Sequence, residues 1–208
     1  MMKPIFIFVF LFLVLFQPAA QARTPLYEEA IRDTDRMLFI PEDLKEHVYH
    51  DSSVPLQDDG RIPSPSELAL VLRNVSAYEN AKVLIIANNG GWCASVFSKL
   101  FKEIYLIETS RNEENYQEIF ENQGIDNITA YYGSNYAFFS DKGPFDIIFI
   151  QGGITTLTNL FIDQLRSKGE LFAPIQTQEN FQQLIKYRKA NGNVTISAIG
   201  NTFFRVLY

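Results

Sequence analysis

The sequence predicts a single α/β domain with a mostly parallel, seven-stranded sheet, helices on both faces and an antiparallel hairpin at the C-terminus. Two observations support this. Short apolar runs alternate with helical patterns from residue 64 onward, which is typical of parallel strands joined by crossover helices. The run 83–87 ends in small, turn-forming residues at 88–91 and leads into a helix. A strand, turn and helix of this kind is where α/β folds usually meet nucleotide-type ligands.

The chain begins with a predicted export signal. Residues 5–16 are an apolar run, and Ala20 and Ala22 have the spacing of a signal-peptidase site, so cleavage is expected before Arg23. The run is shorter than the roughly 17–25 residues that span a bilayer, so no stable membrane span is expected after cleavage; an uncleaved anchor is the alternative. We therefore expect a signal peptide at 1–22 and one exported domain at 23–208, in a periplasm or outside the cell.

Charge and cysteine content narrow the classes of partner. The 208 residues carry a formal net charge of -6, which disfavours nucleic acid and anionic membranes as partners. Cys93 falls on the apolar face of the helix after the turn and is expected to be buried. Two histidines and one thiol cannot build a usual structural zinc set, so no metal is expected.

Residues 23–65 are predicted to form an N-terminal helical cap and a loop, ahead of a Rossmann-like core at 66–208. The pattern is helical from about 27 to 47, with Pro41 starting a second short helix, and residues 49–65 form an extended loop. Ser64, Pro65 and Glu67 form a capping box with proline at the first helical position, which opens a helix ending near Asn74.

The core elements follow in alternation. Strands are predicted at 82–87, 103–107, 127–132, 145–150 and 170–173, and helices at 92–101, 112–123, 157–165 and 179–189. Two closing strands at 194–199 and 202–207 are expected to form the antiparallel hairpin, with its turn at Gly200 and Asn201.

Several phrases of the sequence resemble the protein-L-isoaspartate O-methyltransferase family. They are Phe39-Ile-Pro-Glu42, Tyr49-His-Asp51, Val54-Pro-Leu56, Ile62-Pro-Ser-Pro65, Val83-Leu-Ile-Ile86, Ile107-Glu108, Tyr132-Gly133, Pro144-Phe-Asp-Ile-Ile148 and the longest, residues 161–175. The resemblance implies a class I S-adenosylmethionine-dependent methyltransferase fold. It also implies S-adenosylmethionine as cofactor and an isoaspartyl-containing protein or peptide as methyl acceptor.

The resemblance also assigns the cofactor site. Ala87, Asn89 and Gly91 occupy the three glycine positions of the family's first motif, in which bare backbone approaches the cofactor. Glu108, at the end of the second strand, matches the acid that accepts hydrogen bonds from both ribose hydroxyls. Ser134 stands where the family has the acid that contacts the adenine end.

The acceptor side is assigned in the same way to Arg61 and Ser64. The family's hydroxyl falls on Pro63, so Ser64, one residue later, is the candidate to contact the acceptor, although it also suits a helix N-cap. Arg61 is a candidate clamp for the acceptor carboxylate, although exposed loop arginines are common.

Two functions therefore stay open from the sequence. The first is an exported isoaspartyl methyltransferase with a remodelled pocket. The second is a catalytically inactive exported relative that binds a peptide or another exported protein, because positions 63, 85, 87, 89 and 134 all depart from the family pattern. The loop at 49–65 and the closing hairpin are the candidate contact surfaces of the second function.

Overall fold

The structure is a computed structural model that describes residues 25–48, 50–56, 60–76, 80–110, 116–152, 157–178 and 181–202. The predicted export signal at 1–22 lies outside these ranges. Within them, no helix is both long enough and apolar enough to cross a membrane.

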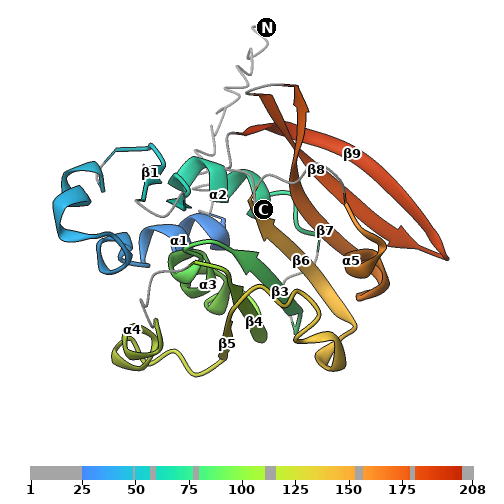
Figure 1. The fold of residues 1–208 in the computed structure, drawn as a ribbon, viewed down its shortest axis with the longest axis horizontal. Coiled ribbons are helices and arrows are strands. Elements are labelled where there is room, and N and C mark those ends of the chain that lie inside the picture. Colours follow the sequence, from blue (N-terminus) through green and yellow to red (C-terminus); the bar gives the residue numbers. More distant parts are fainter. Residues whose placement is uncertain are drawn as a thin grey trace, which may run out of the picture.

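A seven-stranded mixed sheet forms the centre of the domain (Figure 1). Its order is β5-β4-β3-β6-β7-β8-β9, parallel from β5 to β7 and antiparallel from β7 to β9. The strands are β3 (Lys82–Ala87), β4 (Glu103–Glu108), β5 (Ile128–Tyr132), β6 (Phe145–Gln151), β7 (Leu165–Gln178), β8 (Phe181–Ala190) and β9 (Asn193–Thr202). The predicted α/β class is confirmed. The first four parallel strands lie close to the predicted ranges, whereas β7 extends well beyond the predicted 170–173 at both ends.

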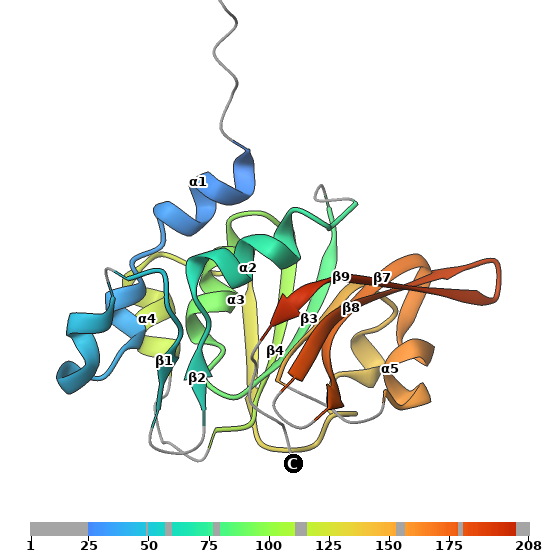
Figure 2. The same ribbon diagram turned by 90° about the horizontal axis from the view of Figure 1, so that it is seen from above.

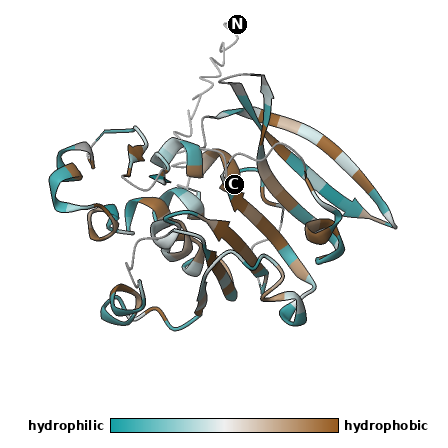
Figure 3. Cartoon of the chain, viewed as in Figure 1, coloured by the Kyte–Doolittle hydropathy of each residue, from teal (hydrophilic) through white to brown (hydrophobic). Residues whose placement is uncertain are grey.

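Helices cover both faces of this sheet (Figure 2). Because side chains alternate along a strand, Val83, Ile85 and Ala87 of β3 enter one core, with α2 (Pro65–Leu72), α3 (Gly91–Ser98) and α4 (Gln117–Asn122). Leu84 and Ile86 enter the other core, with α5 (Asn159–Asp163) and the segment before the short helix η3 (Ser140–Lys142). Hydrophobic residues accordingly dominate the central strands (Figure 3). Cys93 is fully buried in the first core, as predicted.

The N-terminal cap is more broken than predicted. Instead of one helix up to about residue 40, α1 (Leu26–Arg32) is followed by a separate 3-10 helix, η1 (Arg36–Phe39). The second short helix predicted from Pro41 is the 3-10 helix η2 (Glu42–His47). The break occurs because the Asp35 carboxylate accepts a hydrogen bond from the Met37 amide and starts η1 separately. The loop at 49–65 also contains a small antiparallel pair, β1 (Val54–Pro55) and β2 (Arg61–Ile62).

The C-terminal region differs most from the sequence prediction. Residues 181–190, predicted as a helix, form strand β8, which pairs along most of its length with both β7 and β9. Strand β9 contains the first predicted closing strand and continues through the predicted turn, and residues 203–207 of the second lie outside the described ranges. The hairpin turn is therefore at Asn191 and Gly192, both with positive φ, rather than at Gly200 and Asn201. An Asn-Gly pair is the strongest short hairpin signal, because both turn positions require positive φ.

Candidate functional site

Strand register places the candidate residues in one row at the carboxyl edge of the parallel strands. Ala87 of β3 lies opposite Glu108 of β4 on one side and Gln151 of β6 on the other, and Glu108 lies opposite Tyr132 of β5. Ligands of open α/β sheets bind at this edge. The sequence-predicted residues Ala87 and Glu108 are thus brought together beside the turn that carries Asn89 and Gly91.

The Glu108 carboxylate holds the turn at residues 88–91 through hydrogen bonds to its backbone. One oxygen accepts hydrogen bonds from the amides of Asn89 at 2.8 Å and Ser110 at 2.9 Å, and the other accepts from the Gly90 amide at 2.7 Å. The side chain is fully buried. Burial raises the pKa of the Glu108 carboxyl, while these backbone hydrogen bonds oppose that rise. In this structure the carboxylate oxygens accept from the protein's own backbone, and the assignment of Glu108 to the ribose stays a prediction.

A pH dependence of stability follows from the raised pKa of Glu108. The unfolded chain releases this proton near the ordinary glutamate pKa, below the pKa of the folded protein. The free energy of unfolding should therefore fall as the pH rises from the ordinary glutamate pKa to the raised pKa of Glu108 in the folded protein. Above that raised pKa it should level off. Urea unfolding at stepped pH should show this slope in the unmodified protein and a reduced slope in Glu108→Gln. Parallel pH profiles for the two proteins would contradict the assignment.

Aromatic side chains fill the space above the turn. A Cβ atom built on Gly91 would lie 2.7 Å from the Tyr116 ring and 2.9 Å from Phe39, closer than van der Waals contact. The Tyr116 hydroxyl donates to the side-chain oxygen of Asn89 at 3.2 Å, and the Tyr116 amide donates to the Tyr132 hydroxyl at 3.0 Å. Tyr116 and Asn89 are each 1% exposed, so both are packed inside the protein.

The other glycine of the turn is covered by Ala87. A Cβ atom on Gly90 would lie 2.4 Å from the Cβ of Ala87. Asn89 adopts a φ of 65°, the left-handed conformation that glycine prefers and asparagine tolerates. The backbone path of a glycine turn is therefore kept, while the side chains of Ala87 and Asn89 occupy the room that glycines would leave.

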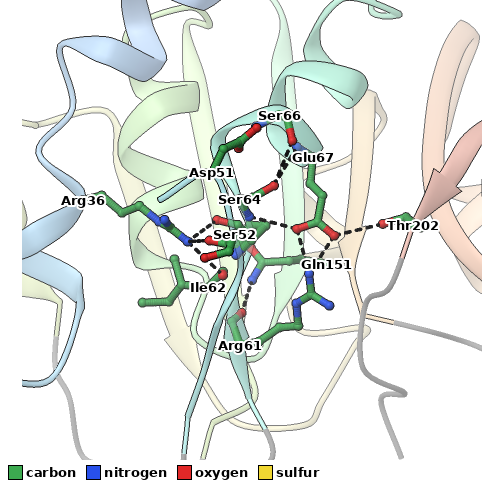
Figure 4. Close-up of polar contacts among 11 residues, drawn as sticks. Arg36, Asp51, Ser52, Arg61, Ile62, Ser64, Ser66, Glu67, Gln151 and Thr202 are labelled. Carbon is green, nitrogen blue, oxygen red and sulfur yellow. Dashed lines mark hydrogen bonds and ion pairs between the residues drawn. The ribbon is translucent and has the colours of Figure 1, made fainter. Parts of the chain in front are cut away.

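Gln151 joins the turn to the acceptor strand β2. Its side-chain nitrogen donates to the carbonyl oxygens of Arg61 and Asn89, each at 3.3 Å (Figure 4 shows the Arg61 contact). Gln151 is 3% exposed, and its side-chain oxygen is buried without a hydrogen-bond partner in the described part of the chain. Gln151 therefore links the turn, which is the predicted donor side, to β2, which is the predicted acceptor side.

The two acceptor-side candidates are engaged in contacts within the protein (Figure 4). One Arg61 nitrogen donates to both carboxylate oxygens of Glu67, at 2.6 and 2.7 Å. Ser64 accepts from the Glu67 amide at 3.2 Å and is 4% exposed, while its own amide donates to the Glu67 carboxylate. This completes the predicted capping box of α2. Their assignment to the methyl acceptor stays a prediction.

Arg36 binds the backbone of the loop that carries Ser64. One of its guanidinium nitrogens donates to the carbonyl oxygens of Ser52, Ile62 and Pro63, at 2.9, 3.2 and 2.8 Å. The guanidinium also lies over the Trp92 ring, 5.2 Å from its centroid. Burial lowers the pKa of Arg36. These contacts link the loop that carries Ser64 to the helix that follows the turn.

Ser134 is separated from this buried group. It follows β5 and is exposed, whereas its neighbour Gly133 donates its amide to the Glu108 carbonyl oxygen at 2.8 Å. The predicted adenine contact therefore stays a prediction. A cavity of about 300 Å³ lies elsewhere, lined by residues that include Asp33, Leu38, Ser98 and Asp126, and none of the turn residues lines it.

Sequence reasoning did not single out Tyr116, and it did not use Arg36. Tyr116 comes from the start of a helix predicted only for its general pattern, and no local signal indicates that its ring covers the turn. Gln151 was likewise not among the predicted site residues. Its role depends on strand register, which brings it beside Ala87.

The fold is that of class I methyltransferases. A solved protein-L-isoaspartate O-methyltransferase superposes with a TM-score of 0.78 at 23% identity, covering 88% of this chain and 61% of that one. A second, from Plasmodium falciparum and solved with S-adenosyl-L-homocysteine, gives 0.66 at 17% identity, covering 88% and 98%. These likenesses establish the fold.

The family itself is shown by the sequence. The model of the protein-L-isoaspartate(D-aspartate) O-methyltransferase family matches residues 18–207, so the chain belongs to that family. The protein-L-isoaspartate O-methyltransferase of Maricaulis maris is 28% identical over 167 residues, covering 80% of this chain and 78% of the relative. That of Thermosipho melanesiensis is 29% identical over 179 residues, covering 80% and 86%.

The described residues do not fit S-adenosylmethionine in this conformation. A donor approaching the turn would meet the methyl of Ala87, the side chain of Asn89 and the ring of Tyr116. The Glu108 carboxylate has no exposed surface from which to accept ribose hydroxyls. No step of methyl transfer can be derived through this arrangement.

Proposed function

We propose that this chain is a non-catalytic, exported member of the protein-L-isoaspartate O-methyltransferase family that binds another exported protein or peptide without methylating it. The observation that carries the proposal is the packing of Tyr116 against Gly91 and its hydrogen bond to Asn89. Export is supported by the apolar run at 5–16 and the A-x-A spacing of Ala20 and Ala22.

Three further contacts support the same proposal. The Glu108 carboxylate accepts hydrogen bonds from three backbone amides, Gln151 links the turn to β2, and Arg61 is paired with Glu67. The Glu108 and Arg61 side chains, which the family resemblance assigns to donor and acceptor, are directed at the protein itself. Buried polar groups with such partners stabilise one closed arrangement.

The second candidate function is methyl transfer from S-adenosylmethionine to an isoaspartyl carboxylate. It is favoured by the family match over residues 18–207 and by Glu108, which keeps an acid at the end of β4. Such a transfer needs mainly positioning, because the carboxylate is already a nucleophile and the sulfonium an activated donor. For this function the turn must open.

A methyl-incorporation assay separates the two functions. The purified protein is incubated with an isoaspartyl peptide and methyl-tritiated S-adenosylmethionine at millimolar concentration, beside the Maricaulis maris relative as positive control. We expect incorporation indistinguishable from a protein-free blank for this chain. Repeated turnover above that blank would establish the enzyme and overturn the non-catalytic proposal.

A further inference from the structure

Strand β9 ends the sheet and has one open side. In the described part of the chain it pairs with β8 alone, from Ala190 opposite Asn193 to Gln182 opposite Thr202. Residues 193–198 are exposed, whereas the end of the strand contacts α2, where the Thr202 hydroxyl donates to the Glu67 carboxylate at 3.4 Å. The open part of the edge is therefore residues 193–198. Figures 1 and 2 both place this hairpin at the border of the molecule, away from α3 and α4.

The composition of β9 leaves this edge unprotected against pairing. Its ten residues include no charged side chain and no proline, and residues 193–198 are all exposed. Val194 is 37% and Ile196 is 65% exposed. Natural sheets usually protect an edge with charge, proline or a very short strand. The opposite edge strand, β5, has only five residues, and its Tyr132 is engaged by Tyr116.

We infer that β9 pairs with β9 of a second copy of this chain, antiparallel and about a twofold axis. A twofold perpendicular to the sheet keeps side chains on their own face, so it can place Ile196 opposite Ile196 of the other copy. Val194 then faces Ala198, and Thr195 faces Ser197. All of these side chains are uncharged and small or β-branched, which suits cross-strand neighbours.

The edge strand β9 carries no charge, so like charges do not oppose each other there when a second copy approaches. With a formal net charge of -6, two copies repel over most of their surfaces. The two copies can approach each other at the neutral strand β9 without opposing like charges. An isologous contact requires a self-complementary patch, and β9 is such a patch. Pairing of one strand buries a small area, so the dimer should be weak and reversible.

Sedimentation equilibrium of the purified protein tests this inference. We expect a concentration-dependent monomer–dimer equilibrium, weakened at least tenfold in Ile196→Lys, because the twofold places the two lysines directly opposite each other. Ile196→Glu should weaken it similarly. An equimolar mixture of the two variants should restore dimers, since lysine then faces glutamate.

The matched control is Thr129→Lys, which adds the same charge to the exposed side of the other edge strand, β5, and should leave the dimer unchanged. Amide hydrogen exchange within 193–198 should slow as protein concentration rises. A protein that stays monomeric at millimolar concentration would overturn the inference. So would a dimer that Thr129→Lys disrupts, or one that the mixture of Lys and Glu variants fails to restore.

Discussion

Replacing Glu108 by alanine is expected to lower the free energy of unfolding by about 3–5 kcal/mol. The substitution leaves the buried amides of Asn89, Gly90 and Ser110 without their acceptor, and each lost partner costs about 1–3 kcal/mol, partly offset by relief of a buried charge. Urea unfolding at neutral pH measures the change.

Glu103→Ala is the control for this prediction, because Glu103 lies on the same strand and its contacts are partly exposed: an ion pair with Lys82 at 3.7 Å and a hydrogen bond from the Tyr105 hydroxyl at 3.3 Å. Its loss should cost less than about 1 kcal/mol. If Glu108→Ala is no more harmful than Glu103→Ala, the carboxylate does not hold the turn, and its role as a buried acceptor is wrong.

The second large effect is a gain of ligand binding. The triple variant Ala87→Gly/Asn89→Gly/Tyr116→Ala removes the three side chains that fill the turn, and glycine at position 89 suits the φ of 65° found there. We expect S-adenosylhomocysteine to bind this variant at least about tenfold more tightly than the unmodified chain, a gain of about 1.4 kcal/mol or more. Isothermal titration calorimetry measures it.

A matched variant, Ala190→Gly/Asn193→Gly, makes two of the same exchanges at the β8–β9 hairpin and should bring no gain. Circular dichroism confirms that each variant is folded before titration. A folded triple variant that binds no better than the parent would show that these side chains are not what excludes the ligand.

The parallel part of the fold could be predicted because local patterns and tertiary contacts agree there. The run at 83–87 is apolar throughout, as expected of a strand covered on both faces, and β3 consists of this run preceded by Lys82. The Ser64 capping box needs only four neighbouring residues. Residues 181–190 carry apolar positions compatible with a helix as well as a strand, and pairing with β7 and β9 decided between them.

The chemistry at the turn could be predicted only in part. Ala87 and Asn89 are only two residues apart in sequence and indicated a crowded turn by themselves. The other side chains around the turn come from distant parts of the sequence. Tyr116 lies 25 residues after Gly91, and Gln151 lies 60 residues after Gly91. Their positions depend on strand register and helix packing, which no local pattern contains. Glu108 was placed correctly at the strand end, but the direction of its hydrogen bonds required coordinates.

Calorimetric titration of the unmodified protein with S-adenosylmethionine and S-adenosylhomocysteine tests the central claim most directly. With the turn filled by Ala87, Asn89 and Tyr116, we expect no heat of binding at millimolar ligand. A dissociation constant in the micromolar range for either ligand would contradict the closed turn and restore methyl transfer as the function of this chain.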